Sequence, residues 1–188
     1  LRVKENFNFF DKKIEKLNNN LEQLCRGLSK LIIVDIALSR DQDNPQLIFE
    51  SMNSTGKALS QADLIRNFVL MGLEPEHQAK LYNNHWRPME IEFGQEGYGS
   101  YFDSFMRHYL TVKTGDIPRI DGVYDAFKQH AQNAETMGLG VDQLVADIHA
   151  FASYFCAMAL DKETDNQLSM AFKDLRELKV DVAYPLLL

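Results

Sequence analysis

IFESMNSTGKALSQADLIRN, residues 48–67, sets a dense run of polar side chains between two apolar helical segments. The first segment is expected to form a short helix that ends in a tight turn, because Gly56 adopts a positive φ without strain and Asn53 tolerates one. Ser60 is the expected N-cap of a second helix, with Asp63 at the third helical position in an approximate capping box. We therefore expect this stretch to fold as a rigid hairpin of two short helices.

The polar side chains of this stretch have two interpretations. In the structural one, Asn53 and Ser60 cap the helices and Gly56 makes the turn. Asp63 then pairs with Arg66, three residues further along the same side of the helix. In the other interpretation, backbone N–H groups at the exposed start of the second helix contact a ligand such as a phosphate. The residues alone favour the structural interpretation.

Upstream, apolar residues recur at spacings of three and four between Phe7 and Leu28, which predicts one long amphipathic helix. Such a stripe is expected to pack into a core, with a coiled coil as the alternative. The next segment, residues 31–38, is β-branched and apolar on both faces, which favours a buried strand over a short helix. Since a lone strand leaves its backbone groups unpaired, we expect its sheet to lie in sequence outside this piece.

Downstream of the polar stretch, the pattern is helical. The helix that begins after Ser60 is expected to end at Gly72, and Pro75 opens a helix that runs toward Trp86 and is broken or kinked at Pro88. The side chains expected on the buried side of the first of these helices are Leu64, Ile65, Phe68, Val69 and Met71. Further helices are expected over residues 101–110, 123–131 and 144–159 and from residue 168, with a flexible glycine-rich loop over residues 94–99. The fold class predicted is mainly α, an irregular helical bundle with at most one or two short strands.

The composition predicts a soluble protein. With 188 residues, of which 45% are hydrophobic, the chain buries a substantial core, and no apolar run approaches the roughly 20 residues of a membrane span. Cys25 and Cys156 lie far apart, with no CxxC and no set of closely spaced cysteines, so neither a disulfide framework nor a zinc ribbon is indicated and a cytoplasmic location is expected. The formal net charge of -7 argues against a broad DNA-binding face, which would need an excess of Lys and Arg.

The sequence offers no catalytic or metal-binding motif. Its histidines show neither HExxH nor HxH spacing and do not pair with a cysteine, so no metal site is predicted. The glycines of residues 94–99 lack the Lys-Ser/Thr of a phosphate-binding loop, and Gly-x-Ser-x-Gly is absent. The histidines are His77, His85, His108, His130 and His149.

The polar stretch resembles a known family signature. The residues that carry the resemblance are Phe49, Asn53, Gly56, Leu59, Asp63, Leu64 and Asn67. They are similar to the motif near the end of the N-terminal domain of GmrSD-type restriction endonucleases, and a weaker similarity follows at residues 81–86 and 123–128. The resemblance implies a ParB/sulfiredoxin-like N-terminal domain with an Asp-Gly-Gln-Gln-Arg motif linked to nucleotide hydrolysis, then a helical region and a nuclease domain of the HNH type.

Neither the Asp-Gly-Gln-Gln-Arg string nor a nuclease motif occurs in this sequence. The resemblance therefore implies that residues 1–72 are the C-terminal part of the ParB/sulfiredoxin-like domain, itself a truncated α/β domain. Residues 73–188 are then the helical middle domain, cut at its C-terminal end. We expect a piece of a longer protein whose missing N-terminal and C-terminal domains are its partners within the same chain.

The resemblance also implies a function without catalysis in this piece. It would position a nucleotide-hydrolysing domain and couple it to a DNA-cleaving domain, with DNA contacted through the full-length protein only. The residues expected to support the nucleotide site are Phe49, Asn53, Gly56, Asp63 and Asn67. A nucleoside triphosphate and a divalent metal ion are expected only in the full-length protein, which would be a nucleotide-dependent endonuclease. The alternatives are a scaffold for protein interaction or homodimer formation without nucleotide or DNA, and direct DNA recognition by one of these helices, which the net acidity disfavours.

Overall fold

The computed structural model describes residues 2–16, 20–33, 48, 51 and 59–188. Helices make up the regular structure of these residues and no strand occurs among them, so the prediction of a mainly α fold is confirmed. The chain forms two compact units, residues 1–39 and residues 40–188. The domain boundary at residue 72 stays a prediction.

The first unit holds two helices where the sequence predicted one. α1 spans Arg2–Glu15 and α2 spans Leu21–Leu28. Asn20, with φ -78° and ψ 54°, lies outside the helical region, and its side-chain oxygen accepts a hydrogen bond from the backbone N–H of Gln23 at 3.3 Å. Asparagine favours such a cap over a place inside a helix, and this explains why the predicted single helix is wrong.

The apolar stripe of this unit is exposed, whereas the sequence predicted its burial. Phe7 and Phe10 on α1 are 68% and 62% exposed, and no residue of α2 is buried. Periodicity determines which face of a helix is apolar, but it does not determine whether another element covers that face. The predicted packing of this stripe into a core is therefore wrong for the described part of the unit.

The predicted strand is absent from the part of residues 31–38 that the structure describes. Leu31, Ile32 and Ile33 have no regular secondary structure and are exposed. Residues 34–38 lie outside the described residues. An apolar β-branched segment forms a strand only where a neighbouring strand pairs with its backbone, and the described residues supply no such neighbour.

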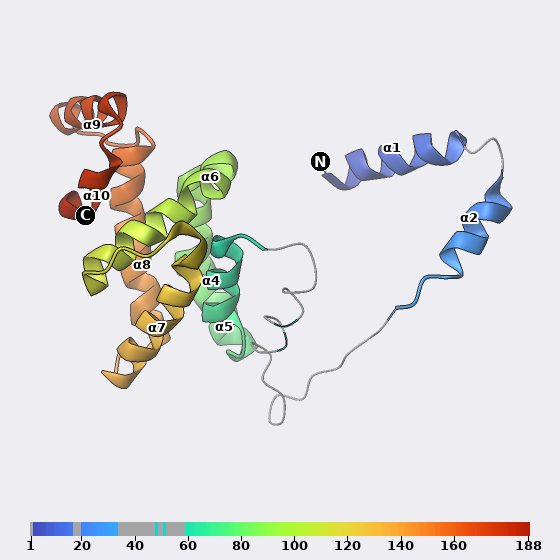
Figure 1. The fold of residues 1–188 in the computed structure, drawn as a ribbon, viewed down its shortest axis with the longest axis horizontal. Coiled ribbons are helices and arrows are strands. Elements are labelled where there is room, and N and C mark those ends of the chain that lie inside the picture. Colours follow the sequence, from blue (N-terminus) through green and yellow to red (C-terminus); the bar gives the residue numbers. More distant parts are fainter. Residues whose placement is uncertain (1, 17–19, 34–47, 49–50, 52–58) are drawn as a thin grey trace. The chain divides into compact units, whose positions relative to one another are not determined.

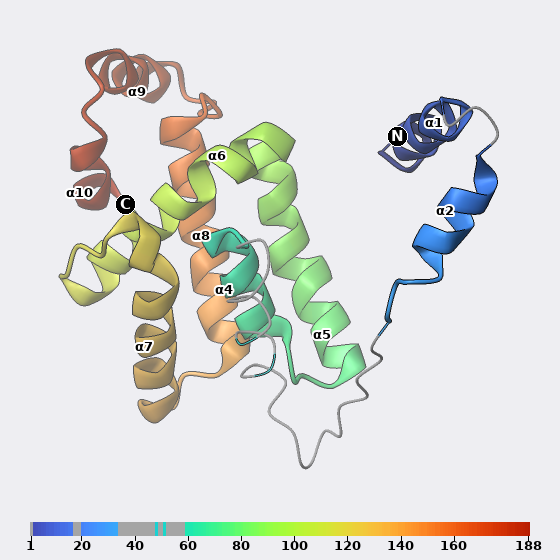
Figure 2. The same ribbon diagram turned by 45° about the vertical axis from the view of Figure 1, so that its right-hand side comes forward.

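The second unit is a helical bundle in which α6 contacts α4, α7 and α8 (Figure 1). Its described elements are α4 (Gln61–Leu70), α5 (Pro75–Leu81), the π-helix η1 (Tyr82–Trp86), α6 (Arg87–Thr114), the 3-10 helix η2 (Ile120–Gly122), α7 (Val123–Thr136), α8 (Val141–Ala159), α9 (Asn166–Leu178), the 3-10 helix η3 (Asp181–Ala183) and α10 (Tyr184–Leu187). Figure 2 shows α9 and α10 at one end of this unit, next to α8 and α6. The helices predicted from periodicity downstream of Ser60 are thus present.

Aromatic side chains fill the core of the second unit. Phe93, Phe102 and Phe105 of α6 gather next to Phe155 of α8, and the centroids of neighbouring rings are 5.5–5.9 Å apart. Such offset and tilted pairs stabilise a core beyond the area that they bury. The helix predicted over residues 101–110 thus contributes Phe102 and Phe105 to this aromatic cluster.

The buried face predicted for α4 is also confirmed in outline. Leu64, Ile65 and Val69 are buried, and Phe68 packs against the core. Met71 is only half-buried, because the helix has already ended at Leu70. One apolar side of α4 thus belongs to the same core as α6, α7 and α8.

The main bend of α6 occurs at Gly94 and not at the predicted Pro88. Gly94 has φ 73° and ψ 166°, a conformation that glycine adopts readily. Pro88 lies in the first turn of α6, where proline is tolerated. The predicted glycine-rich loop is otherwise helical, and a Cβ on Gly97 would lie 3.4 Å from the Cδ1 atom of Leu160, the residue that follows α8.

Candidate functional site

The start of α4 carries the described part of the motif. The Ser60 hydroxyl accepts a hydrogen bond from the backbone N–H of Asp63 at 3.1 Å and donates one to the Asp63 carboxylate at 2.8 Å. The predicted N-cap at Ser60 is confirmed, with Asp63 at the third helical position. A carboxylate in the first turn also interacts favourably with the helix dipole.

A residue from another helix completes this cap. Asp103 of α6 accepts a hydrogen bond from the backbone N–H of Ala62 at 3.0 Å and also from the backbone of Gln61. Burial raises the pKa of Asp103, and the negative charge of Asp63 raises it further. The two backbone hydrogen bonds lower this pKa, but burial has the largest effect. Asp103 is thus a partly desolvated carboxylate held against the positive end of α4.

These contacts weigh against a ligand at the start of α4. The N–H groups of the first helical turn are those that an anion would need. The Asp103 carboxylate accepts hydrogen bonds from the backbone N–H groups of Gln61 and Ala62, and the Ser60 hydroxyl accepts one from the backbone N–H of Asp63. The helix start is already capped by the protein, which favours the structural interpretation of the motif.

An ion-pair chain joins α4 to the start of α6. The Arg66 guanidinium lies 3.1 Å from the Asp63 carboxylate, as predicted, and 3.2 Å from the Glu90 carboxylate of α6. The Tyr82 hydroxyl of η1 donates to the other oxygen of Glu90 at 3.1 Å. Exposed ion pairs are individually weak, but these half-buried groups link three elements of the bundle.

A further hydrogen bond joins α4 to α7. The side-chain oxygen of Gln61 accepts from the backbone N–H of Tyr124 at 2.7 Å, in the first turn of α7. Gln61 therefore caps α7, while Asp103 caps α4. Sequence reasoning missed both contacts, because nothing in the spacing of these residues indicates which helix ends meet.

The predicted site residues are only partly described. Asp63 and Asn67 are half-buried on α4, four residues apart and so on the same side of the helix. Phe49, Asn53 and Gly56 lie outside the described residues, and with them the turn of the predicted hairpin. Of the predicted first helix, Ile48 and Ser51 are described and both are helical.

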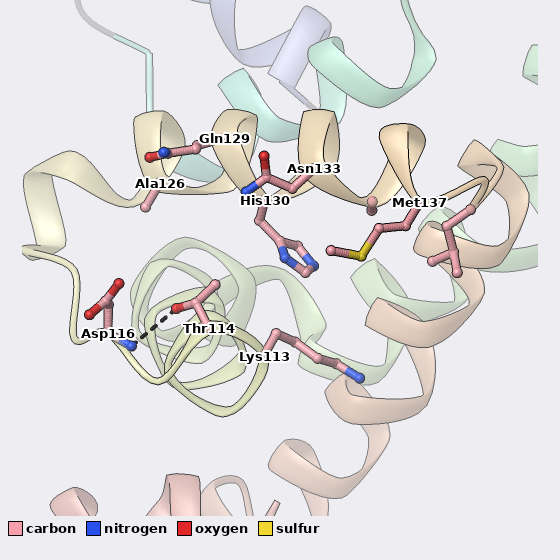
Figure 3. Close-up of a pocket in the computed structure, with 10 residues that line it drawn as sticks. Lys113, Thr114, Asp116, Ala126, Gln129, His130, Asn133 and Met137 are labelled. Atoms are coloured by element: carbon pink, nitrogen blue, oxygen red, sulfur yellow. Dashed lines mark hydrogen bonds between the residues drawn. The ribbon is translucent and has the colours of Figure 1, made fainter.

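A second polar cluster lies beside a cavity of about 490 Å³ between α6 and α7. Figure 3 shows His130 of α7 pointing into the space between the two helices, with Lys113 of α6 on the other side of that space. The Lys113 ammonium lies 2.8 Å from the Asp147 carboxylate and 4.1 Å from the centroid of the Phe151 ring. The ammonium group that borders this cavity is therefore already paired within the protein.

Two histidines from distant parts of the sequence face each other. The Nδ1 atoms of His85 in η1 and His149 in α8 are 3.3 Å apart, and the rings are nearly perpendicular at 80°. Burial, and then the neighbouring His85, lower the pKa of His149, while Glu92 acts in the opposite direction. The Ser153 hydroxyl, one turn after His149 on α8, donates to the Glu92 carboxylate at 2.8 Å.

Other titratable groups lie in the core of the second unit. His108 is 6% exposed, and burial lowers its pKa. Cys156 is a free thiol whose pKa burial raises to about 12, so it is not a nucleophile at neutral pH. Within the described ranges, no group of three or more His, Cys, Asp and Glu side chains is placed to hold a metal ion.

Comparison with known families identifies the N-terminal part of the chain. Residues 1–70 match the family model of the GmrSD restriction endonuclease N-terminal domain. These residues are of the GmrSD type. The matched segment includes the motif and the whole of α4, and the resemblance seen in the motif is thereby confirmed.

A GmrSD-type segment indicates a restriction-type defence protein. No curated protein and no solved structure matches the chain. Among the described residues, no helix combines the length and the apolar character needed to cross a lipid bilayer. The GmrSD match ends at residue 70, which is also the last residue of α4.

Proposed function

We propose that this chain is the non-catalytic helical part of a restriction-type defence protein, where it couples a nucleotide-hydrolysing domain to a DNA-cleaving domain. The main support is the position of α4. This helix ends the GmrSD-type segment, yet its apolar side is part of the core of the helical unit. A displacement of the motif would therefore reach α6 and α7 directly.

The contacts of α4 suit such a coupling role. Its first turn is held by Asp103 of α6, Gln61 holds the first turn of α7, and Arg66 joins it to Glu90. Interactions that are distributed over three neighbouring elements make α4 move as one body with them. The motif residues Phe49, Asn53, Gly56, Asp63 and Asn67 would, in this proposal, buttress the nucleotide-binding core of the first domain. The nucleoside triphosphate and its divalent metal ion would bind there, outside this piece.

The buttress is tested in the full-length parent protein by Asp63→Ala and Asn67→Ala. Both variants should lower the rate of nucleotide hydrolysis, whereas Asp125→Ala, on an exposed position of α7, is the matched control and should not. Circular dichroism shows that each variant is folded. If a folded Asp63→Ala, Asn67→Ala double variant hydrolyses nucleotide at the wild-type rate, these two residues do not support the nucleotide site.

Coupling is tested separately by loosening α4 from the core. Ile65→Val removes one methylene group from a fully buried side chain and should leave nucleotide hydrolysis in place while weakening nucleotide-dependent DNA cleavage. The two activities are measured in parallel on the same preparation. If both activities fall by the same factor, α4 does not couple them. The isolated chain of 188 residues is expected to hydrolyse no nucleotide and to cleave no DNA, even with Mg²⁺ or Mn²⁺.

A scaffold function is the second candidate, and exposed apolar side chains favour it. Phe7, Phe10 and Ile14 lie on α1 with 39–68% of their surface exposed, which is unusual for an apolar stripe on a folded protein. A surface of this kind fits a protein partner or a second copy of the chain. Sedimentation equilibrium on the wild type and on a Phe7→Ser, Phe10→Ser variant tests whether the chain associates with itself through α1. A wild-type dimer that dissociates on substitution supports the scaffold function. A monomer in both cases contradicts self-association.

A further inference from the structure

We propose that His85 and His149 form a two-histidine site for a divalent transition-metal ion of the zinc type, with water completing its coordination. The site lies between η1 and α8, which pack against each other in the second unit. It does not depend on the coupling function proposed above. The two residues are 64 positions apart in the sequence, so no spacing motif reveals them.

The distance between the two Nδ1 atoms carries the proposal. Two imidazole nitrogens that bind Zn²⁺ at about 2.0–2.1 Å in a tetrahedral arrangement lie about 3.3–3.4 Å from each other. The observed separation is 3.3 Å. The same separation also allows one ring to donate an N–H···N hydrogen bond to the other. A shared ion would take the place of the proton between the two nitrogens, and the titration below distinguishes the two cases.

The local backbone supports a functional position for His85. It belongs to the π-helix Tyr82–Trp86, which lies between α5 and α6, and the backbone N–H of Arg87 bonds to the carbonyl oxygen of Tyr82, five residues earlier. A π-helical turn is rare in proteins and is frequent at functional sites. Here it coincides with the residue that faces His149 across the helix interface.

The nearby charge fits a cation. Metal ligation requires neutral imidazole, which is the main form of a histidine side chain at the pH of the test below. The Glu92 carboxylate, held by Ser153 one turn after His149, supplies negative charge near the pair. Because only two protein ligands are in place, the site should bind more weakly than a structural zinc site with four ligands.

The direct test is calorimetric titration of the tag-free 188-residue chain with ZnCl₂ at pH 7.5, with Co²⁺ absorption as the spectroscopic readout of coordination. We expect one ion per chain. Loss of an outer-shell partner weakens metal binding by about 10–100-fold, so loss of a ligand in His85→Gln or His149→Gln should weaken Zn²⁺ binding at least ~10-fold. The matched control, His77→Gln, removes a histidine outside the pair, one that lies 2.8 Å from the Asp142 carboxylate, and should leave the affinity unchanged.

Several results would overturn the site. These are no Zn²⁺ binding by the wild type, equal binding by the double variant, or an equal loss in His77→Gln. A hydrogen-bonded pair without metal would give the first of these results. If a variant fails to fold, the wild type is titrated with Zn²⁺ while the NMR signals of the histidine rings are followed. The signals of His85 and His149 should shift first. A first shift at His108 or His130 would contradict the proposed site.

Discussion

The carboxylate of Asp103 on α6 caps the first turn of α4 through a 3.0 Å hydrogen bond from the backbone N–H of Ala62. Helix caps usually come from the residue just before the helix, and Ser60 fills that role here. The second cap comes from 41 residues further along the chain. It makes the start of α4 part of the tertiary structure, because α4 and α6 cannot separate without exposing unpaired N–H groups.

Replacing this distant cap should destabilise the helical unit. Loss of a capping side chain costs about 0.5–2 kcal/mol, and we expect Asp103→Ala to lower the free energy of unfolding by that amount. Asp103→Asn keeps an oxygen acceptor and should cost less. Urea unfolding followed by the fluorescence of Trp86, the single tryptophan and a buried one, measures both. Equal losses in the two variants would show that the hydrogen bond is not what matters.

The same residue gives a pH dependence. Burial raises the pKa of Asp103 in the folded protein, so its stabilising contribution is full below the unfolded pKa of about 3.9 and is lost as the pH rises through the folded pKa. Asparagine does not titrate. Relative to the wild type, Asp103→Asn should therefore gain stability as the pH is raised from about 3 to about 7. A stability difference that does not change with pH would contradict the raised pKa.

Acid should destabilise the core through His108. Burial lowers the pKa of this imidazole, so the unfolded chain takes up a proton first as the pH falls below about 6.5. The stability that neutral His108 contributes is present above that pH and is lost as the pH falls through the folded pKa. His108→Leu should lose less stability than the wild type between pH 7 and pH 5, and an equal loss in the two proteins would contradict this role of His108. Unfolding curves at the two pH values provide the comparison.

The buried hydroxyl of Tyr109 is expected to stabilise α8 against α6. It donates to the Asp147 carboxylate at 2.8 Å, and burial, this hydrogen bond and the negative charge of Asp147 all raise its pKa. Tyr109→Phe should cost about 1 kcal/mol, the net value of a typical hydrogen bond, or more because the acceptor is charged. Tyr154→Phe, at an exposed position of α8, is the control and should cost nothing measurable.

The largest loss of folding stability is expected where α4 packs into the core. Ile65 is fully buried, and truncating such a side chain typically costs about 2–5 kcal/mol. Ile65→Ala should therefore unfold at much lower urea concentration than the wild type. Ile117→Ala, at an exposed position, should stay within about 0.5 kcal/mol. If both variants have the same midpoint, α4 does not contribute to the cooperative unit.

Local features of the fold were predictable because they depend on neighbours along the chain. The cap at Ser60, the ion pair of Asp63 with Arg66 and the buried face of α4 follow from spacings of three and four residues. The family motif was recognisable for the same reason, since it is a contiguous pattern of residue types. The bend at Gly94 was not, because a glycine-rich stretch is compatible with both a loop and a bent helix.

Periodicity, capping residues and the motif were enough to predict a mainly helical chain, the start of α4 and the family that the N-terminal segment resembles. The folded chain was needed to show that Asp103 caps α4, that His85 meets His149, and that the apolar stripe around Phe7 is exposed. The physical reason is that helix periodicity fixes the face on which a side chain lies, whereas the identity of the group opposite that face depends on how distant helices pack.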